Sequence, residues 1–139
     1  MKAKKILNAF TLIFITAALF SSCKSSFPVA GTPIECNGQL IKPIKNPTKR
    51  AEFTGGQQAM HNFLRENIKL SETITTKGKV RVAFIVTKDG EICDVRVTSK
   101  PKEYIDNEVI RVIKGMPKWI PGTNEGKIID CYYLLDINF

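Results

Sequence analysis

The chain has 139 residues, of which 43% are hydrophobic and 24% are charged, and its formal net charge is +8. This length suits one small hydrophobic core and excludes two separate domains. Because the chain has a single histidine, His61, and no Cys-x-x-Cys pair, a zinc site is not expected, and we predict no metal and no cofactor.

The first 22 residues have the layout of a secretory signal peptide. Three lysines precede an apolar run over residues 6–20, which leads into Ser21, Ser22 and Cys23. The run is shorter than the roughly 20 apolar residues of a good bilayer span, so an uncleaved anchor is the lesser alternative. Because a cysteine ends the small residues, the segment resembles a bacterial lipoprotein signal, in which Cys23 is acylated and becomes the first mature residue. An ordinary signal with a chance cysteine is the other interpretation.

Removal of this segment changes the charge of the remaining chain. Its three lysines leave with it, so the formal net charge falls from +8 to +5 and nucleic acid is not the expected partner. The remaining cations suit solvated surface, an anionic membrane or an acidic partner. An acidic run after the cysteine is associated with display of lipoproteins on the cell surface, and none follows Cys23. We therefore expect a membrane-anchored lipoprotein that faces the periplasm.

Residues 23–50 form the next segment, which is rich in Ser, Gly, Asn and Lys. It contains four prolines, at Pro28, Pro33, Pro43 and Pro47, and little apolar periodicity. This composition predicts a flexible tether between Cys23 and a folded unit made of residues 51–139.

The folded unit begins with a predicted helix. Thr54 and Gln57 fit a capping box. Apolar residues then recur on one helical face at Met60, Phe63, Leu64 and Ile68. His61 lies off that face, so we expect it on the surface.

Two β-rich runs follow, over residues 79–87 and 91–98. Asp89 and Gly90 join them and are a strong signal for a hairpin turn. Alternation puts the apolar residues of both runs on one face, namely Val80, Val82, Phe84 and Val86 on the first and Cys93, Val95 and Val97 on the second.

The last part of the chain indicates a helix, a rigid corner and a long strand. The helix runs from Ile105 to Met116, along one apolar stripe, and Pro117 ends it. Trp119 follows as a core anchor before a turn at Pro121 and Gly122. From Ile129 onward the residues alternate, with Cys131, Tyr133, Leu135, Ile137 and Phe139 on one face and Asp130, Tyr132, Leu134, Asp136 and Asn138 on the other.

These elements predict an α+β domain with a small antiparallel three-stranded sheet and two helices packed on one face. The helix after the hairpin can cross over the first strand and lay the last strand beside it. The spatial order is then second, first, last, and the C-terminal strand is an edge. If one disulfide forms, Cys93 and Cys131 are the candidate pair, because both lie on the predicted inward face, but we expect both to be buried free thiols.

Several motifs in residues 51–139 resemble the C-terminal domain of TonB-type energy transducers, particularly the Bacteroidetes form. They are Ala51-Glu52-Phe53, Gly55-Gly56, Met116-Pro117-Lys118-Trp119 and Pro121-Gly122, with the hairpin GKVRVAFIVTKDGEICDVRV and the tail YYLLDINF. Asp136 stands where this family often has a proline. We take the structural anchors of the domain to be Phe53, Met116, Pro117, Trp119, Pro121 and Gly122.

The resemblance implies a periplasmic domain that binds the TonB box, a short extended segment of outer-membrane TonB-dependent transporters. Binding adds that segment as a strand to the sheet, beside the last strand. The implied partner-binding residues here are Ile128, Ile129, Asp130, Cys131, Tyr132, Tyr133, Leu134 and Leu135. TonB proteins proper also have an N-terminal transmembrane helix that docks on the ExbB–ExbD motor, and a long Pro-rich spacer. The sequence shows neither, so we do not expect direct engagement of such a motor. We expect the lipid on Cys23 to attach the chain to the membrane instead.

Another function class uses the same strand. An envelope scaffold or assembly lipoprotein pairs its edge strand with a second copy, as a homodimer, or with another partner, and transduces no energy. An enzyme is not expected, because the sequence shows no paired carboxylates at a meaningful spacing and no Ser or Cys beside a plausible base.

Overall fold

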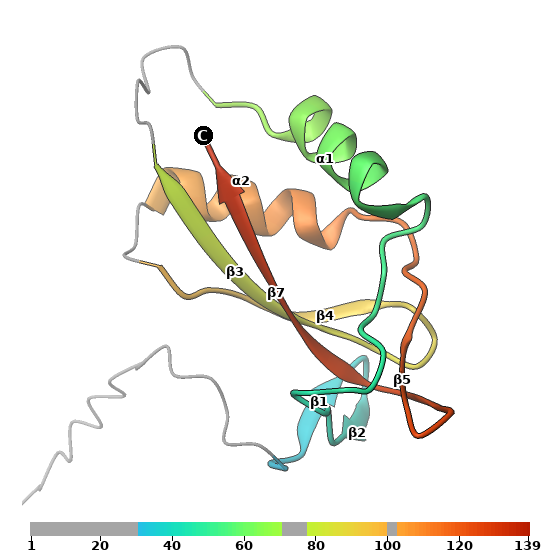
Figure 1. Ribbon diagram of the computed structural model, residues 1–139. Helices are drawn as coiled ribbons and strands as arrows, with labels where there is room; N and C mark the ends of the chain where they lie inside the picture. Colours follow the sequence, from blue (N-terminus) through green and yellow to red (C-terminus); the bar gives the residue numbers. More distant parts are fainter. Residues whose placement is uncertain (1–30, 71–77, 100–102) are drawn as a thin grey trace, which may run out of the picture.

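The computed structural model describes residues 31–70, 78–99 and 103–139 (Figure 1). The predicted signal peptide and Cys23 lie outside the described residues. At the centre is an antiparallel sheet in the order β4–β3–β7, formed by β3 (Lys79–Val86), β4 (Ile92–Val97) and β7 (Cys131–Asn138). The predicted order is confirmed, and β7 is an edge strand of this sheet.

Both helices cover the same face of the sheet, as predicted for this α+β domain. They are α1 (Gly56–Asn67) and α2 (Glu103–Lys114). Their apolar residues pack on alternate residues of β3, including Val82 and Phe84, which are fully buried. In the part of the chain that the structure describes, no helix is long and apolar enough to cross a membrane.

Trp119 occupies the centre of this core and is only 3% exposed. Its ring meets Phe53, Phe84 and Tyr133 edge to face, with centroid separations of 5.7, 5.4 and 4.7 Å. Such aromatic pairs contribute about 0.5–1.5 kcal/mol each beyond the area they bury. The indole thus joins the start of α1, the central strand and the edge strand into one unit.

The start of α1 differs from the predicted capping box. The N-cap is Gly55, with φ +91°, and no side chain caps the helix. Thr54 Oγ1 instead donates a hydrogen bond to the Lys118 carbonyl at 2.5 Å. The capping prediction is wrong because the hydroxyl ties the helix start to the neighbouring corner rather than to its own backbone.

The end of α1 is held against α2 by a charged pair. Glu108 accepts hydrogen bonds from the Lys69 backbone N–H at 2.7 Å and from Arg111 at 2.8 Å, and Arg111 also donates to the Asn67 carbonyl. The Arg111 guanidinium, and then the Lys69 N–H, lower the pKa of Glu108 to about 2. These contacts hold the C-terminal end of α1 against α2.

A bulge in β4 changes the face on which Cys93 lies. Ala83 pairs with Arg96, but Ile85 pairs with Cys93, so two residues of β4 oppose Phe84 alone, and Asp94 there has φ +50°. An inserted residue shifts the side-chain alternation by one. Val95 and Val97 therefore face the helices as predicted, whereas Cys93 faces the opposite side of the sheet.

This face change gives Cys93 a disulfide partner other than the candidate Cys131. Cys93 bonds to Cys36, with a Cα–Cα distance of 5.9 Å, and Cys131 is a buried free thiol. The candidate Cys93–Cys131 pair is wrong because the bulge places the two sulfurs on opposite faces of the sheet, and the expected free thiol is confirmed for Cys131 but wrong for Cys93.

The disulfide attaches an N-terminal hairpin, formed by β1 (Ile34–Cys36) and β2 (Gln39–Ile41), to the second face of the sheet. There it covers Ile85 and Tyr132. The following residues make further bridges at Ile44, Lys49 and Glu52. The predicted flexible tether is therefore wrong for this stretch, since long-range pairing orders a segment whose composition resembles a linker.

A second short hairpin connects the Trp119 corner to β7. It consists of β5 (Gly122–Asn124) and β6 (Lys127–Ile129). Figure 1 shows it projecting beyond the central sheet.

Candidate functional site

The outer edge of β7 carries backbone groups that β3 does not use. At one end of the ladder Phe139 and Gly78 exchange both backbone hydrogen bonds, so odd-numbered β7 residues face β3. At the other end the Tyr132 N–H points away from β3, to the Ile44 carbonyl. By this alternation, the N–H and C=O groups of Leu134, Asp136 and Asn138 point outward. Within the described residues these groups have no partner, and we call this stretch the open edge.

The start of the same edge is already occupied. Ile44 lies parallel to β7, donates its N–H to the Asp130 carbonyl at 2.9 Å and accepts from the Tyr132 N–H at 3.0 Å. The chain thus adds one residue of its own to the sheet edge. A guest strand finds free backbone only beyond this point, from Leu134 onward.

The predicted partner-binding residues divide into four groups in the structure. Ile128 and Ile129 belong to β6 and pair with β5. Asp130 and Tyr132 bond to Ile44, and Cys131, Tyr133 and Leu135 direct their backbone toward β3. Of the predicted set, Leu134 lies on the open edge, and its side chain is 58% exposed. Whether these residues bind a partner remains a prediction.

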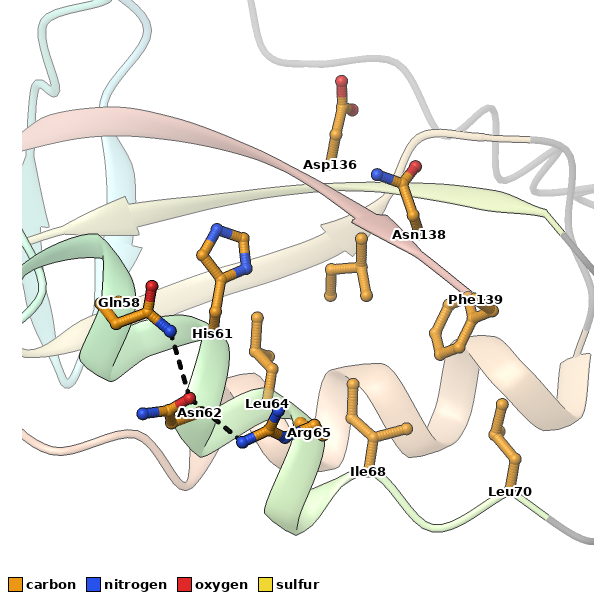
Figure 2. A pocket seen from close by; sticks show the side chains of 11 residues that line it. Gln58, His61, Asn62, Leu64, Arg65, Ile68, Leu70, Asp136, Asn138 and Phe139 are labelled. Carbon is orange, nitrogen blue, oxygen red and sulfur yellow. Dashed lines mark hydrogen bonds between the residues drawn. The ribbon is translucent and has the colours of Figure 1, made fainter.

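A groove of about 480 Å³ runs between α1 and the end of β7 (Figure 2). Apolar side chains line it at Leu64, Ile68, Leu70, Ile137 and Phe139, and polar side chains at Gln58, His61, Asn62, Arg65, Asp136 and Asn138. Figure 2 shows His61 directed from α1 toward β7, while Asp136 points away from the helix. The exposed position of His61 is confirmed, and it places the ring beside the open edge.

Asp136 lies on the second face of the sheet, where it is held by two cations. Arg81 Nε donates to its Oδ1 at 2.7 Å, and Lys79 Nζ lies 2.7 Å from its Oδ2. The Arg81 guanidinium, and then Lys79, hold the pKa of Asp136 well below its ordinary value. The side chain is thus engaged with β3, while the backbone of the same residue stays open.

Two further hollows, of about 330 and 320 Å³, lie beside Tyr133 in the first half of β7. Both are lined by Arg50 and Tyr133, the first also by Lys45 and the second also by Lys49. Burial raises the pKa of the Tyr133 phenol, and Arg50 acts in the opposite direction. This end of the site is therefore lined by cations.

The predicted structural anchors lie around the Trp119 corner. Phe53, Trp119 and Gly122 are buried, Met116 and Pro121 are half-buried, and Pro117 is exposed beyond the end of α2. A Cβ on Gly122 would lie 2.8 Å from Cys131 Sγ and 2.9 Å from the Lys49 carbonyl, so the strand approach there requires glycine. Burial also raises the pKa of the Cys131 thiol.

Sequence reasoning missed two parts of this site. The pairing of Ile44 and the wall formed by α1 depend on contacts between distant segments, for which the sequence carries no local signal. The extension of the open edge to Asp136 and Asn138 had a signal, because the alternation of β7 continues to the last residue. Among the described residues no group of three His, Cys, Asp or Glu side chains could hold a metal ion.

Comparison with known families gives one match. Residues 71–139 match the family described as Gram-negative bacterial TonB protein C-terminal. No curated protein and no solved structure matches the chain. The matched range contains β3 to β7 and α2, and it leaves out α1, the N-terminal hairpin and Ile44.

Domains of this family are protein-interaction domains that contact TonB-dependent outer-membrane transporters in general. The match indicates a TonB-like role in energising transport, and a place at the cell envelope. The observed sheet, with β7 at its edge and α2 across one face, agrees with the architecture predicted from the resemblance. Through residues 71–139, this chain belongs to the TonB C-terminal domain family.

Proposed function

We propose that the open edge of β7 binds the TonB box of an outer-membrane transporter by adding it as a fourth strand to the sheet. The observation that carries this proposal is the row of outward backbone groups at Leu134, Asp136 and Asn138. Each backbone hydrogen bond to a guest contributes about 0.5–1.5 kcal/mol. An unpaired edge otherwise invites aggregation, so its retention favours a binding role.

The groove beside α1 supports the same proposal. A strand added to β7 lies about 4.8 Å from it, on the side where the groove opens. Alternate guest side chains then enter the apolar part of the groove, near Leu64 and Phe139, while His61 and Arg65 lie at its rim. Backbone bonds supply affinity in this mode, and the groove supplies side-chain selectivity.

Backbone amide exchange measured by NMR tests the proposal directly. The protein is residues 23–139 carrying Cys23→Ser, and the probes are TonB-box peptides from transporters of the same cell. Binding is expected to slow exchange at the amides of Leu134, Asp136 and Asn138, which lack a partner in the free chain. The amides of Tyr133 and Leu135 are the internal control, because they already bond to β3. Saturable binding without new protection at the open edge would contradict the proposal.

The same measurement distinguishes transporter binding from the scaffold alternative. A scaffold that pairs through β7 already protects these three amides without peptide, and light scattering then reports a dimer whose dissociation exposes them. An outcome of this kind, with no response to TonB-box peptides, would replace transporter binding by self-pairing as the function of the edge.

We also propose that Cys23 carries the lipid that anchors the chain to a membrane, with the domain in the periplasm. The order imposed by β1 limits the distance from this anchor: between Cys23 and Ile34 the chain can span at most about 40 Å. Mass spectrometry of the N-terminal peptide is expected to show a lipid adduct on Cys23 in cells. An unmodified N-terminus after cleavage elsewhere would refute the anchor.

A further inference from the structure

Three cations lie where the open edge begins. Lys45, Lys49 and Arg50, which we call the basic strip, are all exposed. They line the two hollows of about 330 and 320 Å³ that meet at Arg50 and Tyr133. Within the described residues none of the three forms an ion pair with a carboxylate. The strip therefore presents unneutralised charge in a concave part of the surface.

The backbone of the strip is fixed by pairing on both sides. Ile44 bonds to β7, and Lys49 exchanges two hydrogen bonds of 2.9 Å with Thr123. Glu52 exchanges two more with Ile120, at 2.9 and 2.8 Å. The three cations therefore stand on an ordered backbone and not on a loose linker, so less backbone freedom is lost when a ligand binds there.

The position of the strip indicates the kind of ligand that it suits. The hollow lined by Lys45 and Arg50 is also lined by Leu134, the first residue of the open edge. A guest strand paired with Leu134, Asp136 and Asn138 therefore has one flank directly beside the strip. Glu52 also lines one of the hollows, but one carboxylate beside three cations leaves an excess of positive charge. The other nearby carboxylate, Asp130, accepts a hydrogen bond from the Lys88 N–H.

We infer that the basic strip binds carboxylates in the flank of the guest segment, so that this chain prefers extended peptides with acidic residues beside the pairing stretch. This inference rests on the proposed function and adds the chemistry of the partner to it. The concave placement beside the open edge favours a peptide over a lipid surface. Residues 42–50 lie outside the family match, so the preference belongs to this chain's own N-terminal segment.

Two synthetic peptides test the inference. They share one TonB box and differ only in their flanks, which are Asp-Asp on both sides in one and Asn-Asn in the other. Isothermal titration at low salt is expected to give about three- to tenfold tighter binding of the acidic peptide. The advantage is expected to shrink as added salt shortens the screening length to about 8–10 Å.

A matched pair of variants assigns the advantage to the strip. The strip variant carries Lys45→Gln, Lys49→Gln and Arg50→Gln, and the control carries Lys88→Gln, Lys114→Gln and Lys118→Gln, which lose the same formal charge away from the two hollows. The strip variant is expected to bind both peptides equally, and the control is expected to keep the preference. In both variants the glutamines leave the backbone bridges in place, and NMR spectra report whether the fold is retained.

The possible outcomes separate the inference from the proposed function. Equal affinity of the two peptides, with both protecting the open-edge amides, overturns the inference and leaves strand addition standing. A preference that persists in the strip variant also overturns it. Binding of phosphatidylglycerol vesicles that requires the strip, without any peptide preference, assigns the cations to a membrane surface instead. Binding of neither peptide to the open edge overturns both proposals.

Discussion

Replacing single residues of β7 by proline tests which backbone N–H groups of this strand point outward and which bond to β3. Leu134 and Leu135 are neighbours, but the N–H of Leu134 points outward and that of Leu135 points toward β3. Proline removes one N–H, and sheets tolerate this loss only where that N–H is not part of the ladder. The two substitutions should therefore have opposite effects on binding and on stability.

Leu134→Pro is expected to leave the domain folded and to weaken peptide binding. The side chain is 58% exposed, so little apolar burial is lost. The missing donor removes one hydrogen bond to the guest, worth about 0.5–1.5 kcal/mol, or about two- to tenfold in Kd. Leu134→Ala is the matched control, because it keeps the N–H and should bind nearly as the parent does if the backbone carries the affinity.

Leu135→Pro is expected to destabilise the domain severely. Leu135 is 6% exposed, and loss of such a core side chain costs about 2–5 kcal/mol, to which the lost ladder bond adds about 1 kcal/mol. The total free energy of unfolding of such a domain is about 5–15 kcal/mol. Urea denaturation measures stability and titration calorimetry measures binding. Parent-like binding by Leu134→Pro, or parent-like stability of Leu135→Pro, would refute the assignment of the open edge.

Three further predictions concern stability. Cys36→Ser opens a disulfide that closes 57 residues and should lower the unfolding free energy by about 4 kcal/mol in the chain-entropy model; an equal denaturation midpoint with and without the bond would contradict this. Gly90→Ala places a methyl group against the Trp119 carbonyl, whereas Gly126 has a similar φ and open space around it. Gly90→Ala should therefore lower the unfolding free energy by about 1–3 kcal/mol more than Gly126→Ala does. Equal melting temperatures of the two variants would disprove the close approach. The pKa of Glu108 is depressed from 4.5 to about 2, so the stability that its carboxylate contributes is present above pH 4.5 and is lost as the pH falls to about 2. The difference in unfolding free energy between the parent and Glu108→Gln should therefore shrink over that window. A constant difference would rule out this linkage.

Local periodicity was enough to predict the elements and their order. Alternation marked β3 and β7, the apolar stripe and Pro117 marked α2, and the crossover through α2 left β7 at the edge. These features depend on which side chains can be buried together within one strand or helix. The same residues carried the resemblance to TonB C-terminal domains, which the family match over residues 71–139 confirmed.

The disulfide partner of Cys93 is a feature that sequence periodicity did not predict. One extra residue at the β4 bulge, near Asp94, reverses the face of Cys93 and thereby its partner. A strand's alternation has a period of two, so a single insertion inverts every side chain beyond it. Sequence pattern locates a strand but does not show such an insertion.

By itself the sequence determined the elements, their order, the core face and the family, because each depends on burial patterns within short segments. Only the tertiary structure decided how much of the β7 edge is open. Ile44 covers its start and α1 walls its end, through contacts that join residues far apart in the chain. Such contacts are chosen by the whole fold, since a segment with the composition of a linker becomes ordered when backbone partners and a disulfide are placed beside it.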